Sequence, residues 1–154
     1  MTQYTQNIFA PGEGQRRLFL KAGCPFCTKL VVFLSAAGLQ ETVKPIYDCP
    51  TVRTYIAAVN GGRCTFPAIE LEPDVSVMLE TDDIIAMLMQ EHNIDASTLW
   101  ASRYFEQGML ITFRALFRYL IEREGGYENA KAWFEANAQM VRNPCPPEGA
   151  AKIV

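Results

Sequence analysis

The sequence has few charged residues, 20% of its 154 positions, and a single histidine, His92. Its 14 lysines and arginines are scattered and the formal net charge is −3, so no basic patch is available to hold the phosphates of a nucleic acid. Nowhere do eighteen apolar residues follow one another without a charge, which argues against a membrane-spanning helix. The first residues also lack the basic start and apolar stretch of a secretory signal. We therefore expect a cytoplasmic protein that contacts neither nucleic acid nor membrane.

The cysteines are odd in number, which excludes a fully paired framework of structural disulfides. The five cysteines are Cys24, Cys27, Cys49, Cys64 and Cys145. Because the chain is expected inside the cell, any disulfide should be catalytic or transient. The hydrophobic content of 49% is ample for a buried core, so the chain should fold rather than remain disordered.

The two ends of the chain are predicted to be tails. Residues 1–15 are polar and rich in turn formers, and residues 143–154 contain three prolines. Between these ends the pattern changes near residue 95, from short mixed elements to two long helical stretches. We therefore expect one domain over residues 16–95, followed by a helical region over residues 96–142.

Residues 16–95 begin with strand and helix patterns in alternation. The stretch "RRLFLKA" predicts a buried strand, and Pro25 opens a helix that Gly38 closes, since proline suits a first helical turn. The stretch "TVKPIYD" predicts a second strand, which Pro45 places at an edge of the sheet. A helix over "TVRTYIAAV" follows and stops at a glycine pair.

The same domain ends with a hairpin and a helix. The stretches "TFPAIEL" and "VSVMLE" predict the hairpin, with Val75, Val77 and Leu79 on one face. The helix begins at Thr81, whose hydroxyl is expected to cap it. A right-handed βαβ unit joined to this hairpin predicts an α/β fold, a four-stranded mixed sheet with helices on both faces.

The region after residue 95 carries two apolar stripes at roughly helical spacing, separated by Gly125 and Gly126. The first stripe is Leu99, Phe105, Leu110, Phe113, Phe117, Leu120 and Ile121, and the second is Trp133, Phe134, Ala136, Met140 and Val141. Two helices cannot bury such faces alone, so we expect them to cap the first domain, with most of the stripe in the core. A share of the aromatic surface could instead form a homodimer.

Cys24 and Cys27 stand three positions apart and leave three interpretations open. A structural zinc site would need four ligands, usually two close pairs, and the other cysteines and His92 are distant in sequence. Two buried structural thiols are a second interpretation, because cysteine is a common core residue. As a redox pair, Cys24 would gain thiolate character from the start of the helix at Pro25 and from the charge of Lys21, and Cys27 would lie one turn away to resolve a mixed disulfide.

Three motifs in register carry a resemblance. The run from Lys21 to Cys27, "KAGCPFC", then "TFP" at residues 65–67 and "ETD" at residues 80–82, resembles glutaredoxins and the amino-terminal domain of glutathione S-transferases. The resemblance covers about residues 16–95. It implies a thioredoxin-like fold of the glutaredoxin type, βαβ-α-ββα, with a short α-helical region after it.

The resemblance also implies roles for individual residues. Cys24 would be the nucleophile and Cys27 the resolving thiol of a dithiol centre without a metal. Glutathione would be the cosubstrate, bound by Lys21, Phe26, Phe66, Pro67, Glu80, Thr81 and Asp82. In that arrangement Pro67 would be a cis-proline, Phe66 would offer its backbone to the cysteine of glutathione, and the start of the helix at Thr81 would hold the γ-glutamyl end. Lys21 would meet the glycine carboxylate.

The expected function is glutathione-dependent thiol–disulfide exchange on glutathionylated or disulfide-bonded substrates. Conjugation of glutathione to an electrophile is an alternative, although the helices that build an electrophile pocket in transferases are shortened here. Two further alternatives are a protein-binding module with a redox switch and a dimer that holds an iron–sulfur cluster. Cys64, just before the proposed cis-proline, is a candidate third redox thiol.

Overall fold

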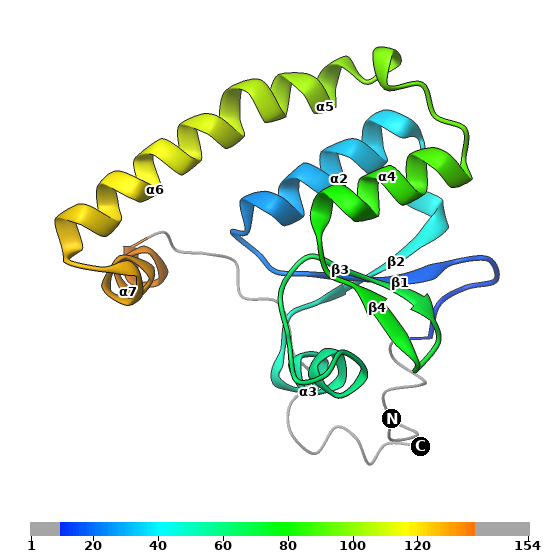
Figure 1. Ribbon diagram of the computed structural model, residues 1–154, viewed down its shortest axis with the longest axis horizontal. Helices are drawn as coiled ribbons and strands as arrows, with labels where there is room; N and C mark the ends of the chain where they lie inside the picture. Colours follow the sequence, from blue (N-terminus) through cyan, green and yellow to red (C-terminus); the bar gives the residue numbers. More distant parts are fainter. Residues whose placement is uncertain (1–9, 138–154) are drawn as a thin grey trace.

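The computed structural model describes residues 10–137, and it contains a four-stranded mixed sheet with helices on both faces (Figure 1). The strands are β1 (Arg16–Leu20), β2 (Val43–Tyr47), β3 (Ala68–Glu72) and β4 (Ser76–Met78), in the spatial order β2-β1-β3-β4. β1 pairs parallel with β2, while β3 pairs antiparallel with both β1 and β4. The predicted sheet, with the proline-containing strand at its edge, is confirmed.

The helices of the first domain enclose the sheet from two sides. α2 (Pro25–Ala37) and α4 (Thr81–Glu91) cover one face, and α3 (Pro50–Val59) covers the other, as Figure 1 shows. Side chains alternate along β1, so Leu18 and Leu20 pack with α2 and α4 whereas Phe19 packs with α3. Short 3-10 turns at Gln40–Thr42 and Ala96–Thr98 join these elements to their neighbours.

Two local predictions in this domain are wrong. The Thr81 hydroxyl does not cap α4, because Thr81 is already the first helical residue and is largely buried. Glu80 occupies the N-cap position, and its side chain forms no capping hydrogen bond either. Val75 is 59% exposed whereas Val77 is buried, so the two do not share a face. β4 is only three residues long and starts after Val75, which leaves that side chain on the turn.

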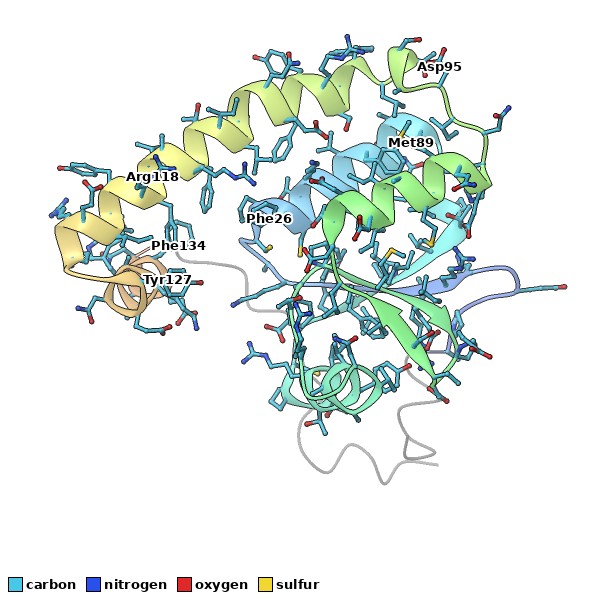
Figure 2. The ribbon with its side chains drawn as sticks, viewed as in Figure 1. Phe26, Met89, Asp95, Arg118, Tyr127 and Phe134 are labelled. Atoms are coloured by element: carbon cyan, nitrogen blue, oxygen red, sulfur yellow. The ribbon has the colours of Figure 1, made fainter. Side chains whose placement is uncertain are left out.

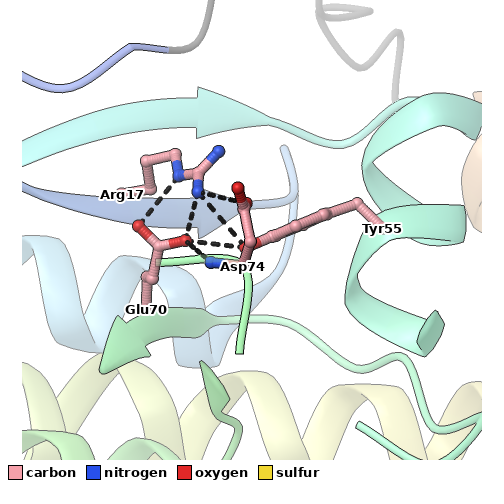
Figure 3. A network of polar contacts seen from close by, with 4 residues as sticks. All are labelled: Arg17, Tyr55, Glu70 and Asp74. Atoms are coloured by element: carbon pink, nitrogen blue, oxygen red, sulfur yellow. Dashed lines mark hydrogen bonds and ion pairs between the residues drawn. The ribbon is translucent and has the colours of Figure 1, made fainter. Parts of the chain in front are cut away.

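A buried polar network ties the sheet to α3 (Figure 3). The Arg17 guanidinium forms two hydrogen bonds with the Glu70 carboxylate, one of them from Nε to Oε2 at 2.8 Å. Arg17 also donates to Asp74 Oδ1 at 2.8 Å, and the Tyr55 hydroxyl donates to Glu70 Oε1 at 2.6 Å. Burial first, and then the bond to Glu70, raises the pKa of Tyr55. The network therefore joins β1, β3, α3 and the hairpin turn.

The helical region begins as one long helix that runs past the sheet. α5 (Trp100–Tyr104) continues through a π-helical turn, Phe105–Met109, into α6 (Leu110–Glu124), and α7 (Tyr127–Asn137) folds back after it (Figure 1). Gly125, with φ of +75°, ends α6 as predicted. None of the helices within residues 10–137 is long and apolar enough to cross a membrane.

The expected helical cap is present only in part. α5 packs on α2, and Leu99, Leu110 and Leu120 are buried. The aromatic members of the first stripe are only half-buried, Ala136 is exposed and Trp133 is 39% exposed, so most of that surface does not join the core. The reason is that α6 extends beyond the sheet, where, among the described residues, it packs mainly against α7 (Figure 1). Met140, Val141 and the rest of residues 138–154 lie outside the described residues.

Candidate functional site

Cys24 lies at the junction between β1 and α2 and caps the helix. Its backbone is extended, its Sγ accepts a hydrogen bond from the Cys27 backbone N–H at 3.4 Å, and Pro25 follows in the first turn. Cys27 lies one turn further in and is buried, with the Lys21 backbone N–H donating to its Sγ at 3.3 Å. The helix start therefore holds both sulfurs among backbone donors.

The two thiols differ in acidity. The pKa of Cys24 is lowered to about 6, mainly by the hydrogen bond from the Cys27 side chain, with help from the backbone donors of Cys27 and Phe26 and from the charge of Lys21, against the opposing effect of burial. The same side-chain hydrogen bond, burial and the nearby Cys24 charge raise the pKa of Cys27. At neutral pH the pair therefore holds one thiolate and one thiol.

The third component of the site is the loop before β3. The Phe66–Pro67 peptide bond is cis, as the resemblance implied. The Phe66 carbonyl oxygen lies 3.7 Å from Cys24 Sγ, which brings the "TFP" motif beside the thiol. Within residues 10–137, no three His, Cys, Asp or Glu side chains gather into a group that could hold a metal ion.

The "ETD" motif at the start of α4 is engaged in ion pairs that the sequence did not reveal. Asp82 Oδ1 lies 2.5 Å from Lys29 Nζ, and Lys29 also reaches Glu106 in the π turn at 3.4 Å. Glu80 lies 3.7 Å from Arg63 on the surface. The Asp82 side chain is 82% exposed, so its second oxygen remains available for another donor.

A cavity of about 570 Å³ opens directly at the cysteine. Lys21, Cys24, Phe26 and Phe66 line one side of it, while Pro67 and residues 80–82 do not contribute. The opposite side comes from α6 and α7, through Phe113, Arg114, Phe117, Arg118, Ile121, Tyr127, Lys131, Phe134 and Glu135. Figure 2 shows Phe26 at the start of α2, with Arg118 on α6 and Tyr127 and Phe134 on α7 across from it.

Four aromatic rings of this far wall hold α6 against α7. Phe113 and Phe117 stack at 5.7 Å between ring centroids, and Phe134 meets both rings edge-on at 6.2 and 6.4 Å. Tyr127 meets Phe117 edge-on at 5.9 Å. The helical region therefore supplies a wall of the cavity beside Cys24.

Cys64 and Cys49 pack with the α3 face of the sheet, not with the Cys24 side. Burial, and then the charge of Asp48, raises the pKa of Cys64. This environment disfavours its thiolate, so the structure gives no support to Cys64 as a third redox thiol.

Comparison with known proteins identifies the first domain. Residues 23–91 match the family described as "Glutathione S-transferase, N-terminal domain". This segment belongs to that family. The thioredoxin-like fold inferred from the motifs is thereby confirmed.

Other comparisons add little to this family assignment. No curated protein matches the sequence significantly. Among solved structures, dehydroascorbate reductase from Chlamydomonas reinhardtii is similar, with 18% identity and a TM-score of 0.41 over 74% of this chain and 66% of that one. The chain thus spans just under two thirds of that protein, and the likeness is too weak to bear on activity.

Proposed function

We propose that the protein is a glutathione-dependent thiol–disulfide oxidoreductase that reduces mixed disulfides of glutathione. The supporting observation is the unequal pair: Cys24, with a pKa of about 6, borders an open cavity, while Cys27 is buried one turn behind it. A thiolate attacks disulfides and a thiol does not, so Cys24 is the proposed nucleophile at neutral pH.

The first step transfers the glutathionyl group from substrate to protein. The Cys24 thiolate attacks the glutathione sulfur of a mixed disulfide, R–S–S–G. A bond forms between Cys24 Sγ and that sulfur, the substrate S–S bond breaks, and RS⁻ leaves and takes a proton from solvent. Cys24 Sγ is then part of a neutral disulfide, so no negative charge remains at the start of α2.

The second step regenerates the thiolate. A glutathione thiolate attacks the sulfur of the bound glutathionyl group, forms oxidised glutathione and releases the Cys24 thiolate. Alternatively, Cys27 loses its proton to solvent and attacks Cys24 Sγ, which forms the Cys24–Cys27 disulfide and releases glutathione. Two further glutathione molecules then reduce that disulfide by two successive exchanges, which yields oxidised glutathione and restores the Cys24 thiolate and the Cys27 thiol. Two causes of the high Cys27 pKa, the bond to the Cys24 thiolate and its charge, disappear once Cys24 is capped. The Lys21 backbone N–H, 3.3 Å from Cys27 Sγ, is then placed to stabilise the new thiolate.

Glutathione would extend from Cys24 over the cis-proline loop toward α4. In this proposal the backbone of Phe66 pairs with the cysteine of glutathione, since the Phe66 carbonyl already faces Cys24 Sγ at 3.7 Å. The amides that begin α4 at Thr81 hold the γ-glutamyl carboxylate, and Asp82 and Glu80 hold its amine. Lys21 meets the glycine carboxylate. Pro67 shapes the loop and Phe26 contributes apolar surface.

The test is an assay in which glutathione reduces a glutathionylated peptide. The reaction produces oxidised glutathione, and a coupled reduction of that product provides the readout. We expect Cys24→Ser to lose activity by about a hundredfold or more, because the nucleophile is removed. Cys27→Ser should retain turnover by the glutathione route and accumulate protein that carries one glutathionyl group on Cys24, visible by mass spectrometry. Full activity of Cys24→Ser would disprove the assignment.

Transfer of glutathione to an electrophile is the second candidate, and the cavity is the observation that favours it. Its apolar far wall could seat an aromatic electrophile next to glutathione. An assay with an aromatic halide separates the two functions. Conjugation that survives Cys24→Ser, combined with no reduction of the glutathionylated peptide, would favour the transferase.

A further inference from the structure

The cavity at Cys24 shares Lys21, Phe26 and Phe66 with the place proposed for glutathione, but it extends from there toward α6 and α7 and not toward α4. It contains none of the α4 residues 80–82, and more than half of its lining residues come from α6 and α7. A volume of about 570 Å³ is within the usual range for a site that holds a small molecule. If glutathione occupies the α4 side, this volume is left for the R group of the mixed disulfide.

The charged side chains around this space are mostly positive. Its lining includes four basic residues, Lys21, Arg114, Arg118 and Lys131, and one acidic residue, Glu135. The whole chain has a formal net charge of −3, so the excess of positive charge is local to the cavity. The sequence predicts no basic patch because these residues are scattered along the chain, but folding brings the four together here. Such a concentration attracts anions into the cleft.

These basic groups are not neutralised by carboxylates of the described chain. Within residues 10–137, none of the four makes an ion pair. Arg114 instead lies over the ring of Phe26, with Cζ 5.1 Å from the ring centroid, which leaves the edge of its guanidinium free to donate. Basic side chains without carboxylate partners beside apolar walls suit a ligand carboxylate, which a guanidinium binds with two hydrogen bonds.

We propose that the R group accepted by this cavity has an apolar, ring-sized body and carries a negatively charged group. The rings of Phe113, Phe117 and Phe134 would bury the body, while Arg114 and Arg118 would bind the anion. The inference rests on the proposed function, since it names the substrate class of the same site. The chemistry is the thiol–disulfide exchange given above, with RS⁻ as the leaving group.

A pair of fluorescent probes that share a ring system tests this charge preference. Anilinonaphthalene sulfonate is anionic and N-phenylnaphthylamine is neutral, and both can be titrated into Cys24→Ser protein, where no turnover occurs. We expect Arg114→Gln and Arg118→Gln each to raise the Kd of the sulfonate about fivefold and to change that of the neutral probe less than about twofold. Higher ionic strength should weaken only the sulfonate.

Matched controls place the probe in the cavity. Arg103→Gln removes an exposed charge on α5 that does not line the cavity, and it should change neither Kd. Phe117→Ala should weaken both probes, because Phe117 lines the cavity, whereas Leu116→Ala, at a position 64% exposed beside it, should weaken neither. Equal losses for the two probes in the arginine variants, no loss in either, or a larger effect of Leu116→Ala than of Phe117→Ala would each overturn the proposal.

The two proposals fail differently. If wild-type protein shows no glutathione-dependent turnover but the arginine variants lose the sulfonate selectively, the proposed function is wrong and the charge preference stands. If turnover follows Cys24 as expected but the two probes respond alike, the charge preference alone is wrong.

Discussion

Cys24 and Cys27 have opposite pKa shifts although the two residues lie on the same helical turn. The hydrogen bond between their side chains is the largest cause of both shifts, and it lowers one pKa as it raises the other. Position decides which thiol ionises: Cys24 lies at the helix start and is half-buried, whereas Cys27 is buried one turn deeper. The reactivity of Cys24 therefore depends on its neighbour as much as on the helix.

Replacing Cys27 should change the acidity of Cys24. In wild-type protein the alkylation rate of Cys24 should rise with pH through about 6 and level off above it, because only the thiolate reacts. Cys27→Ala removes the donor and should raise the Cys24 pKa by about one unit, the equivalent of roughly 1.4 kcal/mol. The measurement is alkylation rate against pH.

Cys27→Ser is the matched control, since its hydroxyl can still donate to the thiolate. We expect its pKa for Cys24 to lie closer to that of wild type than to that of Cys27→Ala. A wild-type value near that of free cysteine, about 8.5, would contradict the assignment of Cys24 as nucleophile.

The site residues that could be predicted from the sequence lie in short contiguous motifs. Cys24 and Cys27 share one helical turn, and the Phe66–Pro67 step carries its own signature, so local pattern is enough to find them. Arg118 and Phe117 lie far along the chain, and only the packing of α6 and α7 brings them opposite Cys24. Their signal in the sequence, aromatic residues four apart with arginines beside them, is also the signal of an ordinary helix face.

At the scale of elements, the strands and helices of the first domain follow from apolar periodicity and from the glycines and prolines at their ends. The π turn was missed, although the sequence contains a trace of it. Phe105 and Leu110 are five positions apart, whereas the other steps toward Ile121 are mainly three or four. A π turn holds about one more residue than an α turn, so a step of five positions matches one turn there.

The neighbouring arginines of β1 offer a comparison of buried and exposed ion pairs. Arg17 and Glu70 have side chains only 6% and 3% exposed, while Arg16 and Glu91 are 36% and 38% exposed. Glu70→Gln leaves the Arg17 charge buried with a weaker partner, so we expect a loss of about 3 kcal/mol or more in the free energy of unfolding. Glu91→Gln should cost about 1 kcal/mol or less.

Urea denaturation of the two variants beside wild type provides the measurement. Similar losses for Glu70→Gln and Glu91→Gln would show that burial does not set the strength of these pairs. Such a result would also remove the reason for regarding the network as the tie between the sheet and α3.

At the scale of the whole molecule, the sheet is packed into the core more extensively than α6 and α7 are. The described core consists mainly of residues from the sheet, α2, α3 and α4, whereas α6 contributes only Leu110 and Leu120 and α7 only Ala130 to the buried hydrophobic residues. Regions with few buried apolar side chains open at lower free energy than the core. We therefore expect α6 and α7 to open without unfolding of the sheet.

Native-state hydrogen exchange measures this difference directly. Amides in α6 and α7 should exchange at opening free energies below those of β1 and β3, and saturating anilinonaphthalene sulfonate should slow exchange in α6 and α7 selectively. Amides of α3, which lie away from the cavity, serve as the internal control. Uniform protection throughout residues 10–137 would instead indicate a single cooperative unit.

Phe66 touches both core clusters and also lines the cavity, whereas Arg114, Arg118 and Lys131 belong to helices outside those clusters. The side of the cavity that contains Phe66 is thus part of the folded core, whereas the side formed by α6 and α7 is not. Variation in α6 and α7 can therefore retune what the cavity accepts while the thiol and its acidity stay as they are. To alter the specificity of the cavity, substitutions therefore belong in α6 and α7, whereas the cis-proline loop should be left unchanged.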